Sequence, residues 1–360
     1  APVATPTPTR PGPVATPTPT LVATPTPAAP AAEQPKRGGI LNQVLGVYTP
    51  NFDAQLLSAT PNYFSANGKL YTNLLVNYEG SNIECEVCSE WHLENNSKTM
   101  VFTLIPGIKF QTGEEMTSAD VVYSLKMIIG ENDGLVSSRA GALKEYVQSI
   151  EAPSKYEVRI NLVRPSAFVP KVLSVAAAVI YKKGTTREDL NKAPAGAGPF
   201  TVKSIVPGAS WEVERNPNYF KKGQPYLDGY KFTVVADTNT QAATFLTGRV
   251  QMPAYLLNIK QFEPQLLTLE SQGKIKRYYD LGGCGATMVL LNNAKPPFNN
   301  LKMRQAVNLV LNRTDVGKVS WGDMIATGVP QLLFFEPRQE FGTPADKIWN
   351  VIPGWGTGAK

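Results

Sequence analysis

Hydrophobic and polar residues change their spacing several times along this chain, and each spacing predicts an element of structure. Residues 156–163 (YEVRINLV) alternate strictly, which is typical of a strand with one buried face. Residues 117–130 (TSADVVYSLKMIIG) instead repeat their apolar positions every three or four residues, as a helix does. Thr117 and Asp120 have the spacing of a capping box, and Gly130 is a signal for the end of the helix.

A second helix is predicted over residues 301–312 (LKMRQAVNLVLN). Its apolar positions fall on one stripe, formed by Met303, Ala306, Val307, Val310 and Leu311. Strands are predicted within 36–46, 99–107, 200–215 and 230–235, and a short helix over 240–248. Because these strands and helices do not alternate regularly, they favour an α/β or α+β architecture with interrupted domains.

Residues 1–36 show none of these patterns. Proline occupies nearly every second position, and the unit VATPTP begins at positions 3, 14 and 22. Such a sequence favours solvated polyproline II over any packed core. We interpret it as a disordered stalk that holds a folded body away from a membrane, with a tail of no particular role as the alternative.

The composition of the chain limits the classes of protein to which it can belong. Residues 37–360 are enough for two domains, and 42% hydrophobic with 18% charged residues is ordinary for a globular chain. The net charge of +6 is scattered, so we predict a solvated surface and no nucleic-acid partner. No apolar run approaches the roughly 18 residues of a membrane span, and residues 172–181 (VLSVAAAVIY) predict a buried element instead.

The cysteines leave three interpretations open. Cys85, Cys88 and the single histidine, His92, have the spacing C-x2-C-x3-H, and Cys284 is a remote fourth candidate for a zinc site. Structural zinc usually takes a second close pair of ligands, which disfavours this site. A local Cys85–Cys88 disulfide or free surface thiols are favoured, and no metal or cofactor is predicted.

No catalytic constellation emerges. His92 is the only histidine, and the carboxylate pair Glu114–Glu115 has no partner that the sequence assigns. The glycine-containing segment 196–200 (GAGPF) leads into a strand, and 354–360 follows a proline-rich stretch, so neither fits a phosphate-binding loop. The sequence therefore favours a binding protein over an enzyme.

The order of these segments resembles the family 5 extracellular solute-binding proteins. Residues 87–125 carry the closest likeness, and GAGPF, RNPNYFKKGQPYLDGYKFTVVAD (215–237) and LLNNAKPPFNNLKMRQAVNLVLNR (290–313) follow in the family's order. The resemblance covers about residues 37–335. Gln251 departs from the acidic residue usual in the family, and family members are much longer than this chain.

The resemblance implies an α/β, two-lobed periplasmic-binding-protein-like fold of type II, with an extra subdomain inserted in lobe one and an incomplete second lobe. The implied ranges are a stalk at 1–36, the base of lobe one at 37–80 and 193–278, the inserted subdomain at 81–192, and the start of lobe two at 279–360. Ligand would bind between the lobes, and the closed form would dock on the membrane permease of an ABC importer.

For function, the resemblance implies a monomer outside the cytoplasm, lipid-anchored through the stalk. The expected ligand is a peptide; an oligosaccharide, or a structural role at the cell envelope, stays open. In this fold, loops that leave the central strands face the ligand. We therefore predict as ligand contacts Tyr48, Asn51, Gly282, Cys284 and Trp321. For each of them, a role in a turn or in core packing is the alternative. Four further residues lie in the motifs that carry the resemblance and are interpreted as structural, namely Asp120, Tyr123, Arg304 and Arg313.

Overall fold

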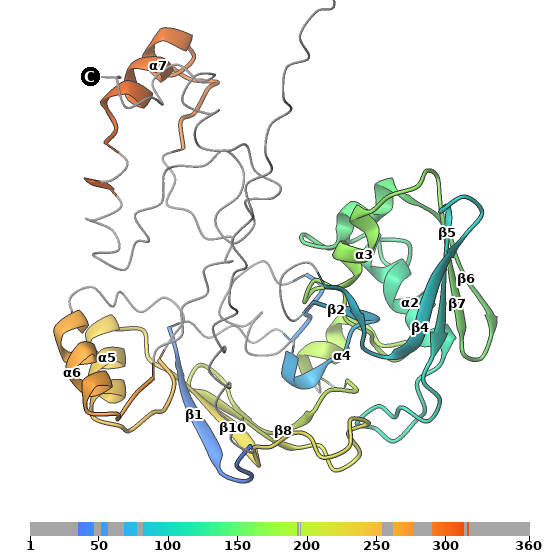
Figure 1. Ribbon diagram of the computed structural model, residues 1–360, viewed down its shortest axis with the longest axis horizontal. Helices are drawn as coiled ribbons and strands as arrows, with labels where there is room; N and C mark the ends of the chain where they lie inside the picture. The colour runs from blue at the N-terminus through green and yellow to red at the C-terminus, as the bar shows by residue number, and fades with distance from the viewer. Residues whose placement is uncertain are drawn as a thin grey trace, which may run out of the picture. The chain divides into compact units, whose positions relative to one another are not determined.

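A computed structural model describes residues 35–46, 52–56, 68–77, 82–192, 194, 196–253, 262–276, 290–312 and 315–316 (Figure 1). The description below concerns the unit formed by residues 37–360. Its elements are β1 (Ile40–Leu45), β2 (Leu75–Val76), β3 (Glu84–Cys85), β4 (Cys88–Glu94), β5 (Thr99–Leu104), α2 (Ser118–Ile128), the 3-10 helix η1 (Gly141–Glu145), β6 (Val147–Ser154), β7 (Glu157–Leu162), α3 (Phe168–Leu173), α4 (Arg187–Lys192), β8 (Phe200–Val206), β9 (Ser210–Arg215), β10 (Gly229–Val234), α5 (Thr238–Leu246), α6 (Glu263–Ser271) and α7 (Leu301–Val310).

The first sheet has the strand order β1-β10-β9-β8. β1 and β10 are parallel, and the other neighbours are antiparallel. The predicted hairpin is present: β8 and β9 turn at Gly208, whose φ of +76° suits the left-handed region that glycine tolerates. A parallel bridge between Gln43 and Met252 places a further extended segment on the other side of β1.

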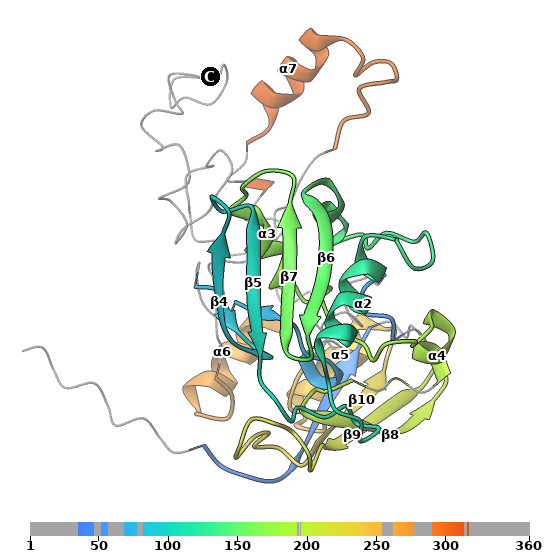
Figure 2. The same cartoon turned by 90° about the vertical axis from the view of Figure 1, so that its right-hand side faces the viewer.

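The second sheet has the order β4-β5-β7-β6 and is antiparallel throughout. Helices α2 and α3 lie on one of its faces (Figure 2). The alternation predicted for β7 is confirmed, since Val158, Ile160 and Leu162 are at most 2% exposed while the residues between them are half-buried. This alternation directs one face of the sheet onto the helices and leaves the other polar.

Helix α2 begins as its sequence predicts. The Thr117 amide donates to Asp120 Oδ2 at 2.7 Å, and the other carboxylate oxygen accepts from the Lys183 amide at 2.8 Å. Gly130 follows the helix with a φ of +82°. Asp120 is therefore structural, as expected. The buried surface of α2 extends beyond its apolar positions, because the buried Ser124 hydroxyl donates to the Tyr181 carbonyl at 3.0 Å.

Helix α7 forms where it was predicted, with the Asn300 side chain accepting from the Lys302 amide at 2.8 Å. Among the described residues of this helix none is buried, and Val310 is 83% exposed, so what the predicted apolar stripe packs against stays open.

Two large hydrophobic cores hold the described layers together, beside a small cluster around Val44 and Val250. One fills the space between the second sheet and helices α2 and α3. The other packs aromatic rings on the first sheet, where Trp211 stacks on Phe232 at 4.0 Å and meets Phe52 edge-on at 5.4 Å. The buried element predicted within 172–181 is confirmed, since its last five residues are at most 1% exposed.

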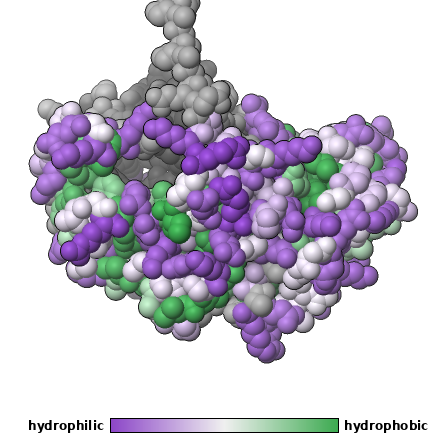
Figure 3. Space-filling model, turned by 90° about the horizontal axis from the view of Figure 1, so that it is seen from below, coloured by the Kyte–Doolittle hydropathy of each residue, from purple (hydrophilic) through white to green (hydrophobic). Residues whose placement is uncertain are grey.

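The surface is largely hydrophilic on the face shown in Figure 3, with hydrophobic residues scattered between polar ones. Among the described residues, no helix has both the length and the apolar character needed to cross a membrane.

Candidate ligand-binding edge of the first sheet

The carboxyl ends of parallel strands meet at one edge of the first sheet. β1 ends at Leu45 and β10 at Val234, which are register partners, and the segment at Met252 runs parallel on the far side of β1. In open α/β sheets, ligands bind in the crevice outside the carboxyl ends of the strands. This edge is therefore the candidate ligand site.

Helix α5 starts beside this edge. Its N-terminus is capped by Asp237, whose carboxylate accepts from the Thr240 amide at 2.8 Å. The Gln241 side chain donates to the Val235 carbonyl at 2.6 Å and lies close to Gly46, where an added Cβ would meet it at 3.2 Å. The end of β1 is thus packed against α5, and the anion-attracting end of the helix already holds its own carboxylate.

The chain that leaves β1 is anchored again at Asp53. This carboxylate is 1% exposed and accepts from Arg187 Nη1 at 2.6 Å, from the Tyr181 hydroxyl at 3.1 Å and from the Gln55 amide at 3.1 Å. A buried carboxylate needs this many partners because it has lost its water. The segment after β1 is therefore fixed at Phe52–Leu56.

Arg187, the first residue of α4, joins this anchor to a second acid. Its Nε donates to Asp133 Oδ2 at 2.5 Å, and its Nη2 donates to the Leu135 carbonyl at 3.2 Å. Burial opposes the charged guanidinium, but the hydrogen bonds to Asp133 and Asp53 raise the pKa of Arg187 above its ordinary value. Burial also raises the pKa of Tyr181 well above its usual range, so this hydroxyl stays a neutral donor.

The five predicted contact residues, Tyr48, Asn51, Gly282, Cys284 and Trp321, all lie outside the described residues. The structure fixes only the flanks of the first two, Gly46 at the end of β1 and the anchored Phe52. These contacts stay predictions. Sequence reasoning missed the pair Asp53–Arg187, because its partners are 134 positions apart and no local pattern connects them.

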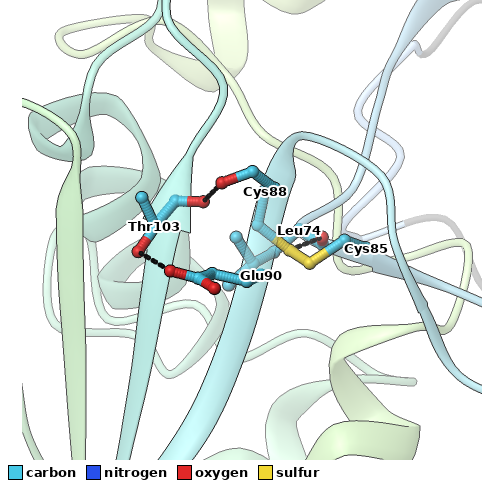
Figure 4. The surroundings of a disulfide bond; sticks show 6 residues. Leu74, Cys85, Cys88, Glu90 and Thr103 are labelled. Carbon is cyan, nitrogen blue, oxygen red and sulfur yellow. Dashed lines mark hydrogen bonds between the residues drawn. A yellow bond between two sulfur atoms is a disulfide. The ribbon is translucent and has the colours of Figure 1, made fainter.

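The cysteine alternatives are resolved in favour of the disulfide. Cys85 and Cys88 are bonded to each other at the junction of β3 and β4, beside Leu74 and near Glu90 and Thr103 (Figure 4). Bonded sulfurs are not thiolates, so this pair does not offer zinc ligands. His92 is exposed and pairs with Glu94 at 3.2 Å, and no metal-binding group of acids, cysteines and histidine occurs within the described ranges.

The acidic pair Glu114–Glu115 has structural partners. Glu115 accepts from Lys155 Nζ at 2.7 Å and from the Tyr156 hydroxyl at 2.8 Å, and these hydrogen bonds, with Lys155 first, lower the pKa of its carboxyl to about 2. Glu114 pairs with Lys182. Each acid is held ionised by its own lysine, so the two do not form an acid–base pair.

Comparison with known proteins decides the family. Residues 82–331 match the model described as "Bacterial extracellular solute-binding proteins, family 5 Middle". The chain belongs to this family. Its members are binding proteins, which confirms the expectation of a binding protein rather than an enzyme, and they are extracellular, which places this chain outside the cytoplasm.

Curated relatives are identical to this chain at about a quarter of the aligned positions. It is 25% identical over 274 residues to "Probable di/tripeptide-binding protein 5" of Pseudomonas aeruginosa, covering 69% of this chain and 51% of the relative. It is 26% identical over 260 residues to "Glutathione-binding protein GsiB" of Escherichia coli K12, covering 68% and 47% respectively. The chain thus spans about half the length of the curated relatives it matches.

Solved structures confirm the fold. The oligopeptide-binding protein AppA of Bacillus subtilis, in complex with a nonapeptide, matches with a TM-score of 0.65 and 23% identity over 79% of this chain and 56% of that one. The periplasmic binding protein DppA of Helicobacter pylori, in complex with the peptide STSA, matches with a TM-score of 0.67 and 24% identity over 80% and 59%. The predicted α/β, two-lobed periplasmic-binding-protein fold is confirmed, and the predicted domain boundaries stay predictions.

Proposed function

We propose that this chain is the solute-binding subunit of an ABC importer, which captures a peptide between two lobes and delivers it to a membrane permease. The observation that carries the proposal is the family 5 match over residues 82–331. The relatives named for di- and tripeptides and for glutathione support a short peptide as the ligand class.

Two of the proposed ligand contacts, Tyr48 and Asn51, follow the carboxyl end of β1 in the sequence, between Gly46 and Phe52. Gly282 and Cys284 are proposed to lie near the crossing between the lobes, and Trp321 in the second lobe. An amide such as Asn51 suits the donors and acceptors of a peptide backbone, and Tyr48 and Trp321 suit peptide side chains. The buried Asp53–Arg187 pair supports the assignment of Tyr48 and Asn51 because it holds the chain directly after them in place.

The proposed setting is the outer face of a membrane. Residues 1–36 form the stalk, lipid-anchored at its start, and the protein acts as a monomer. Lobe one comprises 37–80 and 193–278 with the inserted subdomain at 81–192, and lobe two begins at 279. Closure of the lobes around the ligand would create the form that the permease recognises.

Thermal unfolding with ligand panels tests this proposal. Di- and tripeptides and glutathione are expected to raise the melting temperature, because a ligand present at 100 times its Kd stabilises the folded state by about 2.7 kcal/mol. Tyr48→Ala and Trp321→Ala are expected to weaken the effect. Tyr226→Ala is the matched control. The side chain of Tyr226 is exposed, and its backbone carbonyl accepts from the Gly38 amide at the opposite end of β1.

Two results would contradict the proposal. No shift with any peptide, together with a maltotriose shift that Tyr48→Ala or Trp321→Ala weakens, would make the chain an oligosaccharide-binding member of the family. If neither the peptides and glutathione nor maltotriose changed the melting temperature, a structural role at the cell envelope would be favoured.

A further inference from the structure

A hollow of about 810 Å³ lies at the free edge of the second sheet. It is lined by the apolar residues Ile83, Trp91, Leu93, Pro165, Ala167 and Pro170 and the polar residues Asn82, Glu84, Ser97 and Ser166. We call it the β4 hollow. None of its lining residues belongs to the first sheet, so it is distinct from the candidate peptide site. Its volume is within the roughly 300–1,000 Å³ of small-molecule sites.

The apolar wall of the hollow is an uncovered part of the core face. Trp91 and Leu93 are register partners of Phe102 and Met100, which are at most 1% exposed. Because β4 is the edge strand among the described residues, no described strand of the sheet continues this face (Figure 2). The Trp91 ring stacks on Phe102 with 6.0 Å between centroids and 21° between planes. One ring face of Trp91 is thus packed and held by Phe102, and the same side chain lines the hollow.

The polar residues of the hollow come from three separate segments. Asn82 contributes an amide, Glu84 a carboxylate, and Ser97 and Ser166 hydroxyls, so the rim offers both donors and acceptors. Among the described residues that line the hollow there is no lysine, arginine or histidine. This composition disfavours phosphate and carboxylate ligands and suits a neutral ligand rich in hydroxyl groups.

The disulfide fixes two walls of the hollow relative to each other. Cys85 directly follows the wall formed by residues 82–84, and Cys88 begins the strand that carries Trp91. A preformed site of this kind loses less entropy when it binds a ligand than a mobile one.

We propose that the β4 hollow binds a neutral saccharide. One sugar ring stacks on Trp91, and its hydroxyl groups hydrogen-bond Asn82 and Glu84. The site goes beyond the proposed peptide function and does not depend on it. The saccharide is either a free oligosaccharide or the accessible end of a cell-envelope glycan, which present the same chemistry.

Calorimetric titration of the full chain with maltotriose, cellotriose, mannotriose and chitotriose tests the proposal. At least one trisaccharide is expected to bind, and Trp91→Ala is expected to weaken binding at least tenfold. Asn82→Ala and Glu84→Gln change side chains at exposed positions, so they keep the fold and are expected to weaken binding severalfold. Phe168→Ala is the matched control, because this 47% exposed aromatic lies in the same region but does not line the hollow.

Two further experiments test where the saccharide comes from and whether the disulfide supports its binding. Sedimentation with purified envelope polysaccharide identifies a glycan end as the ligand, whereas binding of soluble trisaccharides alone identifies a free sugar. Reduction of the disulfide is expected to weaken saccharide binding. The proposal is overturned if no saccharide binds, if binding survives both Trp91→Ala and Asn82→Ala, or if only apolar peptides occupy the hollow.

Discussion

Arg187 and Asp53 form an ion pair of 2.6 Å that joins the start of α4 to the segment following β1. The side chains are 14% and 1% exposed, so water screens the pair weakly. Arg187 also pairs with Asp133, and Asp53 also accepts from the Tyr181 hydroxyl. The pair therefore fixes the chain immediately after the proposed contacts Tyr48 and Asn51.

Removing the arginine is expected to destabilise the protein strongly. Arg187→Ala leaves the Asp53 carboxylate buried without its cation, which costs about 3–5 kcal/mol in comparable buried pairs. Urea unfolding measures this loss. Lys192→Ala is the control in the same helix, because its pair with Glu188 is exposed and is expected to contribute less than about 1 kcal/mol. Equal losses in the two variants would refute the role assigned to Arg187.

Gly196 in the GAGPF segment is expected to tolerate no side chain. A Cβ at this position would lie 2.1 Å from the Leu70 carbonyl oxygen. Gly196→Ala must therefore shift backbone, at a cost of about 1–3 kcal/mol typical of overpacking. Gly68→Ala is the matched control, since a Cβ there meets nothing within 4 Å. Denaturant midpoints compare the two, and an unchanged midpoint for Gly196→Ala would argue against this packing.

The Cys85–Cys88 disulfide is expected to stabilise the folded state by only about 2 kcal/mol, because closing a short loop removes little entropy from the unfolded chain. The double variant Cys85→Ser, Cys88→Ser should unfold at lower denaturant than the native protein. Reductant should lower the native midpoint toward that of the variant and leave the variant unchanged. A native midpoint that does not respond to reductant would show that the bond adds no stability.

Stability is expected to fall at acid pH through Glu115. Its folded-state pKa is lowered to about 2, chiefly by the hydrogen bond from Lys155, so its contribution is complete above the unfolded pKa of about 4.5. The contribution is lost progressively as the pH falls from there toward 2. The difference in unfolding free energy between native protein and Glu115→Gln should therefore shrink over this range. A difference that stays constant would contradict the pairing with Lys155.

Local patterns predicted local structure well. The alternation of β7, the capping box of Thr117 and Asp120, and the hairpin at Gly208 depend on neighbours in sequence, and the structure shows each of them. The resemblance to the family also predicted the fold correctly, because the family's motifs occur in a fixed order along the chain.

Long-range relationships were beyond the sequence alone. The pairing of Asp53 with Arg187 depends on how α4 packs against the segment after β1, which no local pattern encodes. The spacing of Cys85 and Cys88 allowed a disulfide, a zinc site or free thiols, and the choice depended on the geometry of β3 and β4. The proposed contacts, including Trp321, rest on the family likeness and lie outside the described residues.

Native mass spectrometry of the protein after incubation with a mixture of di- and tripeptides tests the central claim most directly. The account predicts a one-to-one adduct that is lost on denaturation and whose fragments identify it as a peptide. The absence of an adduct with every peptide in the mixture would contradict the proposed role in peptide import.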